Sequence, residues 1–330
     1  MQYSKRFTEK IIEEMEPFHY SRRRELFARF VGLSIDYAPI YLAIVLLVLT
    51  ILGVDSTALL VMSIISLAYS LFHFYKIFVD SHNVVLRQYE IKIPGLKKET
   101  SFMFVSDMHY GPEYYGAERN KISRIIDLVN SRNKDLVIFG GDFVCSSFEP
   151  SIVSEYAKVK AKNVIGVYGN HDSLYLKEKQ KEEFPTEFFK CMEGSGIKFL
   201  NNEGFKYEDI YFGGITDLYS MNIDIEKAFV EDKGNETRIL ISHHPDIADF
   251  IKDEDSIQLI LSGHTHAGQV RLPIIGPVLP IPCRNKSLVG GLYKINEKLQ
   301  LFISEGAGFS STRLRIGTVC EVCEITLIPE

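Results

Sequence analysis

Tryptophan is absent from this chain of 330 residues, and cysteine occurs only five times. So few cysteines, in an odd number, exclude a disulfide framework as the main stabilising device. An excess of positive charge is also missing. The net charge of −6 provides no basic surface for neutralising phosphates, so we expect no specific nucleic-acid binding. Cys320 and Cys323 have redox or metal spacing, but they lie in a strand-like run where positions i and i+3 face opposite sides, which favours two packed thiols.

Charge is missing from two long stretches near the N-terminus. Residues 37–54 and 56–75 contain no charged side chain, and each is close to the roughly 20 residues that cross a bilayer core. We therefore expect a transmembrane helical hairpin over 37–79, after a basic cytoplasmic segment over 1–36 and before one domain over 80–330. The alternative is a pair of buried helices in a soluble domain, although such helices should carry a polar stripe.

The flanking charges predict the orientation of this hairpin. The flanking basic residues are Arg22, Arg23, Arg24 and Arg29 before it and Lys76, Arg87 and Lys92 after it. Because cytoplasmic flanks carry the positive charge, we expect a cell-membrane protein with two spans and a cytoplasmic catalytic domain. The competing interpretation is a twin-arginine export signal at 21–26, but that segment stands well before the apolar run and a second apolar run follows.

Beyond residue 82, short apolar runs alternate with amphipathic stretches. The runs predicted as strands are 84–93, 101–107, 135–142, 163–170, 210–216, 237–243 and 257–264. The helix-like stretches between them are 118–131, 151–160, 177–193 and 224–231. This alternation predicts α/β layers, and the strand-rich end of the chain predicts that part of the sheet system is antiparallel or mixed.

Five of these strands end in side chains that can bind metals. They are Asp107 and His109, then Asp142, then Asn170, His171 and Asp172, then His243 and His244, then His264 and His266. The His-x-His pair alone is weak evidence of a metal site, because its members could be neighbours on a solvated edge. Five strand ends together are strong evidence, since ligands bind beyond the carboxyl ends of strands in α/β sheets. Oxygen and nitrogen donors without a thiolate suit Mn, Fe or Zn.

Five ordered blocks resemble the calcineurin-like metallophosphoesterase superfamily: SDMHYG, GGDF, GNHD, SHHPD and GHTH. The similarity extends from about residue 84 to the C-terminus. Within the superfamily the chain is similar to membrane-anchored bacterial phosphodiesterases through Gln269, LPIIGP, GLY at 291–293 and GAGFSSTRLR, although that branch often has glycine at the position of Ala267. The resemblance implies a four-layer α/β/β/α sandwich of mixed sheets.

The resemblance also implies two metal sites that share the carboxylate of Asp142. One divalent ion would be held by Asp107, His109, Asp142 and His266. The other would be held by Asp142, Asn170, His243 and His264. Such a pair of ions lowers the pKa of a shared water, and the resulting hydroxide attacks phosphorus.

Other roles carried over by the resemblance concern the substrate. His171 would lie beside the scissile phosphate as an acid or oxyanion stabiliser, with Asp172 orienting its ring, and a structural hydrogen bond is the alternative for His171. Asn170 would also contact substrate. His244 would either approach substrate or lie at the rim. Arg315 would either bind a phosphate bidentately or be a surface arginine.

The resulting functional hypothesis is hydrolysis of phosphodiester bonds near the membrane. One alternative is a UDP-2,3-diacylglucosamine pyrophosphatase of lipid A synthesis, with a lipid-linked nucleotide as substrate. A second is a catalytically silent membrane scaffold, which should lose ligands, whereas all seven are present. Loop 272–283 is either a rigid packed loop or an apolar wall that faces the membrane and receives acyl chains.

Overall fold

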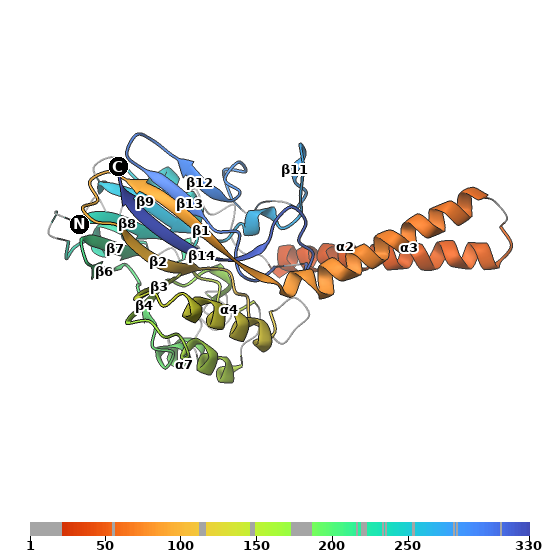
Figure 1. Cartoon of the computed structure of the whole chain (residues 1–330), viewed down its shortest axis with the longest axis horizontal. Helices are drawn as coiled ribbons and strands as arrows, with labels where there is room; N and C mark the ends of the chain where they lie inside the picture. Colours follow the sequence, from red (N-terminus) through yellow and green to blue (C-terminus); the bar gives the residue numbers. More distant parts are fainter. Residues whose placement is uncertain are drawn as a thin grey trace.

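The structure is a computed structural model in which two facing β-sheets carry a long helical hairpin (Figure 1). It describes residues 22–330 apart from 55–56, 112–116, 146–148, 173–186, 216, 219–222, 233, 235, 253–254, 280, 282 and 311. The predicted basic segment over 1–36 is therefore described only from residue 22. In that part, residues 22–36 continue the first helix of the hairpin.

The first sheet has the strand order β1-β14-β2-β3-β4-β5. Its strands are β1 (Val84–Ile93), β14 (Cys320–Pro329), β2 (Thr100–Val105), β3 (Leu136–Phe139), β4 (Asn163–Gly166) and β5 (Lys198–Phe199). All neighbouring strands are parallel except β14 and β2. The strand β14 thus lies between β1, the first strand of the domain, and β2, and β1 forms one edge of the sheet.

The second sheet has the order β12-β13-β9-β8-β7-β6. Its strands are β12 (Gly291–Lys294), β13 (Gln300–Ile303), β9 (Ile257–Ser262), β8 (Thr237–Ile241), β7 (Ile210–Gly214) and β6 (Glu203–Tyr207). Its central pairs are parallel and its two outer pairs antiparallel. The predicted mixed sheets are confirmed, because both sheets contain pairs of both kinds.

Three apolar clusters define the layers of this domain. The cluster between the sheets includes Phe102 and Phe104 of β2 and Phe212 and Phe302 of the second sheet. The outer face of the first sheet packs against α4 (Arg119–Ser131), η3 (Pro150–Ile152), α5 (Val153–Tyr156) and α7 (Glu187–Glu193). Among the described residues, the helices on the outer face of the second sheet are α8 (Ile225–Ala228) and the 3-10 helix η5 (Pro245–Phe250). The fourth layer is therefore thin within the described residues.

The two cysteines of β14 lie on opposite faces, as the strand period requires. Cys323 packs in the cluster between the sheets, whereas Cys320 Sγ lies 3.0 Å from the buried Lys121 Nζ on the other face. Both thiols are free. The prediction of two packed thiols is confirmed.

The helical hairpin consists of α2 (Arg22–Ile51) and α3 (Thr57–Phe78), which pack together and project from the domain (Figure 1). One contact between them joins the Ser70 hydroxyl to the Pro39 carbonyl at 2.8 Å. The stretch Thr57–His82, which includes the 3-10 helix η2 (Asp80–His82), is long and apolar enough to cross a membrane, and Asp36–Ile51 is a shorter apolar helix. Large apolar side chains on both helices are exposed.

Two contacts fasten this hairpin to the domain near its base. Asp36, a buried acid in α2, accepts a short hydrogen bond from the Thr312 hydroxyl, and Arg313 N lies 3.4 Å from its other oxygen. Lys121 of α4 donates to the Ser81 carbonyl at 2.5 Å. The helices are thus attached by polar contacts as well as by the chain itself.

Candidate metal centre

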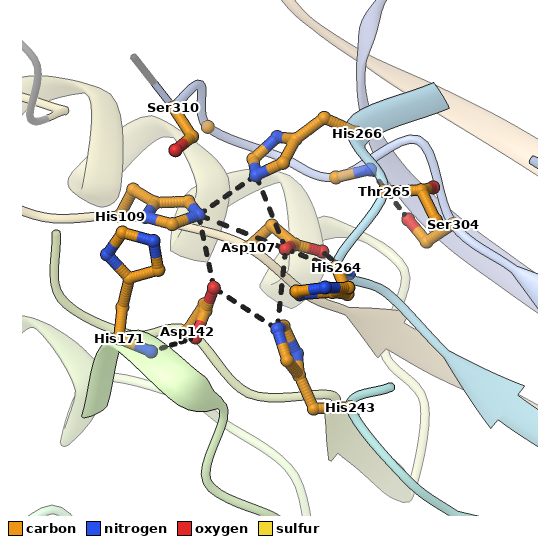
Figure 2. A network of polar contacts seen from close by, with 12 residues as sticks. Asp107, His109, Asp142, His171, His243, His264, Thr265, His266, Ser304 and Ser310 are labelled. Atoms are coloured by element: carbon orange, nitrogen blue, oxygen red, sulfur yellow. Dashed lines mark hydrogen bonds and ion pairs between the residues drawn. The ribbon is translucent and has the colours of Figure 1, made fainter. Parts of the chain in front are cut away.

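The candidate ligands lie on five turns that follow β2, β3, β4, β8 and β9. Figure 2 shows the aspartates and histidines among them, together with His171. The ligand residues with positive φ are Asp107 (55°), His109 (48°), Asp142 (56°), His264 (74°) and His266 (50°). This left-handed conformation is uncommon outside glycine, although Asp and His adopt it more readily than most residues. Such strained positions persist where the surroundings hold them, and they cluster at functional sites.

The first group of ligands is Asp107, His109 and His266, all buried. His109 Nε2 lies 2.9 Å from His266 Nε2, and His266 Nε2 lies 3.4 Å from Asp107 Oδ1. Two imidazole nitrogens and a carboxylate oxygen therefore point at one spot. This is the donor set of a divalent transition metal.

The second group is Asp142, His243 and His264, also buried. His243 Nε2 lies 3.1 Å from Asp142 Oδ2, and the same oxygen lies 3.4 Å from His109 Nε2 of the first group. Asp142 Oδ2 thus stands between the two groups. Its other oxygen accepts a hydrogen bond from His171 N at 2.8 Å, which fixes the carboxylate in this orientation.

Buried polar atoms test whether these residues fit metal ions. Asn170 Oδ1 and His109 Nδ1 are buried without a hydrogen-bond partner in the described part of the chain. His243 Nδ1 lies 2.8 Å from the Gly140 carbonyl, which only accepts, so His243 Nε2 is left to face Asp142. A bound cation would supply the partner that Asn170 Oδ1 lacks, and the residues fit a dinuclear centre.

The electrostatics of the centre reflect its burial. Burial would lower the pKa of His243, but Asp142 and Asp107 raise it to about 10. Burial raises the pKa of Asp107 to about 6, while for Asp142 the neighbouring histidines overcome burial and hold the pKa well below its usual range. The two carboxylates thus favour positive charge at this spot, which a bound metal ion would supply.

Two glycines make room for the two carboxylates. A Cβ on Gly263 would lie 2.2 Å from Asp107 Oδ2, and one on Gly169 would lie 2.2 Å from Asp142 Oδ1. Only glycine allows these strand ends to approach the acids so closely. The strand β9 ends at Ser262, so Gly263 is the first residue of the turn that carries His264 and His266.

The ring of His171 lies beside the first group, 4.6 Å from the ring of His109 (Figure 2). Its Nδ1 lies 2.5 Å from the Cys145 carbonyl. Asp172 was expected to orient this ring, and the structure differs. The Asp172 carboxylate instead accepts backbone N–H groups from Phe143, Val144 and Gly169 at 2.9–3.2 Å. A buried carboxylate needs several donors, and the donors of Asp172 come from two turns. Asp172 thereby joins the turn that carries Asp142 to the turn that carries Asn170.

His244 does not lie at a substrate rim, contrary to one of its two expected roles. Its side chain is fully buried, with Nε2 2.9 Å from Asp217 Oδ1. Its ring centroid lies 3.8 Å from that of His264. His244 therefore packs behind a candidate ligand and holds its ring in place.

Arg315 fits neither of its two expected roles, a surface arginine or a bidentate phosphate ligand, because its side chain is buried and its N–H groups bind protein carbonyls. Its side chain is 1% exposed, and the guanidinium donates to the carbonyls of Glu305, Gly308 and Val319 at 2.7–2.8 Å. Its Nη2 lies 3.2 Å from His266 Nδ1. The five N–H groups of arginine suit this role, in which one side chain fastens the C-terminal loop to the His266 turn.

Gln269 is a further support of that turn. Its amide donates to the carbonyls of Ser310 and Thr312 at 2.7 and 3.2 Å, and its Oε1 accepts from Ser310 N at 2.6 Å. Thr312 is the residue that bonds Asp36 of α2. Sequence reasoning missed Asp36, although an isolated acid directly before the charge-free run 37–54 is a recognisable signal.

Comparison with known proteins agrees with this geometry. The chain is 27% identical over 253 residues to an uncharacterised metallophosphoesterase of Helicobacter pylori, covering 74% of this chain and 64% of that protein. It is 26% identical over 314 residues to one of Campylobacter jejuni, covering 89% and 80%. It is 29% identical over 256 residues to a transmembrane protein with metallophosphoesterase domain of Danio rerio, covering 72% and 55%.

The chain thus spans less than two thirds of the Helicobacter pylori relatives it matches. The family match itself covers residues 100–268, just over half of the chain, and corresponds to the calcineurin-like phosphoesterases. These residues contain all seven candidate ligands. The chain belongs to the calcineurin-like phosphoesterase family.

Proposed function

We propose that this protein hydrolyses phosphodiester bonds with two divalent metal ions. The main support for this proposal is the position of Asp142 Oδ2, which lies 3.1 Å from His243 Nε2 and 3.4 Å from His109 Nε2. One carboxylate oxygen is thus close to both ligand groups. The first ion would be held by Asp107, His109, Asp142 and His266. The second would be held by Asp142, Asn170, His243 and His264. Mn, Fe or Zn suits these nitrogen and oxygen donors.

When bound, the ions would lower the pKa of a water and neutralise charge on the phosphate. The chain itself supplies proton transfer through His171. Because the Cys145 carbonyl can only accept, His171 Nδ1 carries a proton, and Nε2 is the nitrogen that exchanges one. Protonated Nε2 would donate to the leaving oxygen or to a phosphate oxygen. The Cys145 carbonyl thereby takes the orienting role that was expected of Asp172.

A comparison of three variants tests this proposal with bis-(p-nitrophenyl) phosphate and Mn²⁺. Asp142→Ala should lose bound metal and turnover together. His171→Ala should keep its metal and lose about 10²–10⁴-fold in rate. Asp135→Ala, which removes a half-exposed acid paired with Lys162, is the matched control and should behave as the wild type. Retained turnover in Asp142→Ala would refute the dinuclear site.

We further propose that α2 and α3 both cross the membrane and that the domain is cytoplasmic. The long apolar stretch Thr57–His82, the exposed apolar faces of both helices and the basic flanks support this arrangement. Relatives from Danio rerio and Bos taurus are named as transmembrane proteins. Protease treatment of inside-out and right-side-out vesicles tests the orientation, since the domain should be cleaved only in the former.

A membrane tether beside the centre favours a lipid-linked substrate, and a UDP-2,3-diacylglucosamine pyrophosphatase is the alternative activity. Turnover of that compound with release of UMP, against slow turnover of soluble diesters, would select it. Failure on both substrate classes with metal bound would instead favour the silent scaffold.

A further inference from the structure

The hairpin β10 (Arg271–Leu272) and β11 (Gly276–Pro277) exposes apolar side chains at its tip. Ile274 is fully exposed, Ile275 is 72% exposed, and Leu272 and Val278 are also exposed. By contrast, Ile281 and Cys283 further along the loop are buried. The packed-loop interpretation of 272–283 therefore holds for its end and fails for its tip.

The root of this hairpin is fixed to the metal centre. Val278 N donates to the Val270 carbonyl at 2.8 Å, and Arg271 N donates to the Ile316 carbonyl at 2.8 Å. A Cβ on Gly268 would lie 2.7 Å from the Pro277 Cβ, so the hairpin packs directly on the 3-10 turn η7 (His266–Gly268). The hairpin and the His266 turn are therefore in direct contact.

The same root is continuous with the apolar surface of the helical hairpin. Ile77, in the last turn of α3, packs with Val270 and Leu314, and Leu279 and Ile316 complete this cluster. In Figure 1, β11 rises beside the point where α2 and α3 leave the domain, and it runs across the direction of those helices. If the helices cross a membrane, the β10–β11 hairpin lies along the membrane surface.

The shape of the tip indicates what covers it. Ile274 has φ 70°, a conformation that β-branched residues rarely adopt, and it holds the side chain fully outward. The tip is a narrow projection with four exposed apolar residues, too few for a stable protein interface of about 1,200–2,000 Å². A lipid interface needs no matching surface and accepts a few apolar side chains beside an existing anchor.

We propose that the β10–β11 hairpin inserts Ile274 and Ile275 into the headgroup and acyl boundary of the membrane that holds α2 and α3. The inference rests on the proposed membrane anchoring. It adds a third contact with the bilayer, one that comes from the domain itself. Because the root of the hairpin packs on the His266 turn, this contact holds the metal centre next to the lipid surface.

The absence of tryptophan from the chain provides a direct test. Ile274→Trp places a single fluorescent reporter at the tip of the full-length protein, reconstituted in phosphatidylcholine vesicles with or without brominated acyl chains. Ile65→Trp, on the exposed side of α3, is the control for a residue inside the membrane. Val230→Trp, 74% exposed and two residues after the end of α8, is the matched control in water.

The expected result is a blue-shifted and bromine-quenched emission for Ile274→Trp and Ile65→Trp, with neither effect for Val230→Trp. Unquenched Ile274→Trp beside quenched Ile65→Trp would overturn the inference and leave the membrane anchoring intact. A blue shift at position 274 without bromine quenching would assign the tip to a protein contact and also overturn it. Lack of quenching at both 65 and 274 would refute the anchoring itself.

Discussion

Replacing Gly263 with alanine should damage the metal centre while leaving the sheets in place. The added Cβ would lie 2.2 Å from Asp107 Oδ2 and 2.6 Å from Ser106 Oγ. A relaxed contact is about 3.5 Å, so the carboxylate or the strand end must move by roughly 1 Å. A displacement of that size costs about 10²-fold in rate. This corresponds to about 2.7 kcal/mol in the activation barrier.

The assay for Gly263→Ala combines kcat/KM, metal content and thermal unfolding. We expect a loss of about 10²-fold in kcat/KM and a reduced metal content. The free energy of unfolding should fall by only about 1–3 kcal/mol, as for other overpacked positions. Gly194→Ala is the matched control, because its Cβ would meet only the Cys191 carbonyl, at 3.2 Å. Full metal content and full activity in Gly263→Ala would refute this reasoning.

Three further perturbations test other parts of the structure. His244→Ala removes the ring behind His264, so metal affinity should fall about 10–100-fold in a metal titration, and an unchanged affinity would contradict this role. Burial raises the pKa of Glu324, but Lys134 and Arg132 overcome it and leave the pKa lowered. Glu324→Gln should therefore unfold more easily at pH 7, and the difference should disappear as the pH falls below about 4 in denaturant titrations. Chelation should abolish hydrolysis and leave the circular dichroism spectrum intact, and added Mn²⁺ should restore activity.

The strands and the ligand turns could be predicted because each depends on local sequence. The apolar run at 84–93 corresponds to β1 without a shift, and the runs before Asp107, Asp142 and His264 end in the strands β2, β3 and β9. Where an apolar strand stops at small residues, the next polar side chain lies at the carboxyl end of that strand, and this does not depend on the rest of the fold. The family motif then assigned each side chain to a group. The structure gathers six of the seven in two clusters, which are Asp107, His109 and His266, and Asp142, His243 and His264.

The roles of Asp172, His244 and Arg315 could not be predicted from the motif. A motif gives the position of a residue along the chain but not the direction of its side chain within a turn. In the structure Asp172 binds backbone N–H groups, His244 contacts Asp217, and Arg315 binds backbone carbonyls. None of these partners can be recognised from the sequence. The backbone of Ala267 is left-handed, with φ 51°, a conformation that glycine adopts more easily than alanine.

The buried contact of Asp36 with Thr312 bears on how this protein can be prepared. A shortened chain that begins after residue 79 would be attractive as a soluble enzyme, but it would lack the carboxylate that binds the Thr312 hydroxyl. Thr312 and Ser310 hold the Gln269 amide three residues after His266. We therefore expect a loosened turn in such a fragment, so the helices should be kept in any preparation used to test the proposed activity.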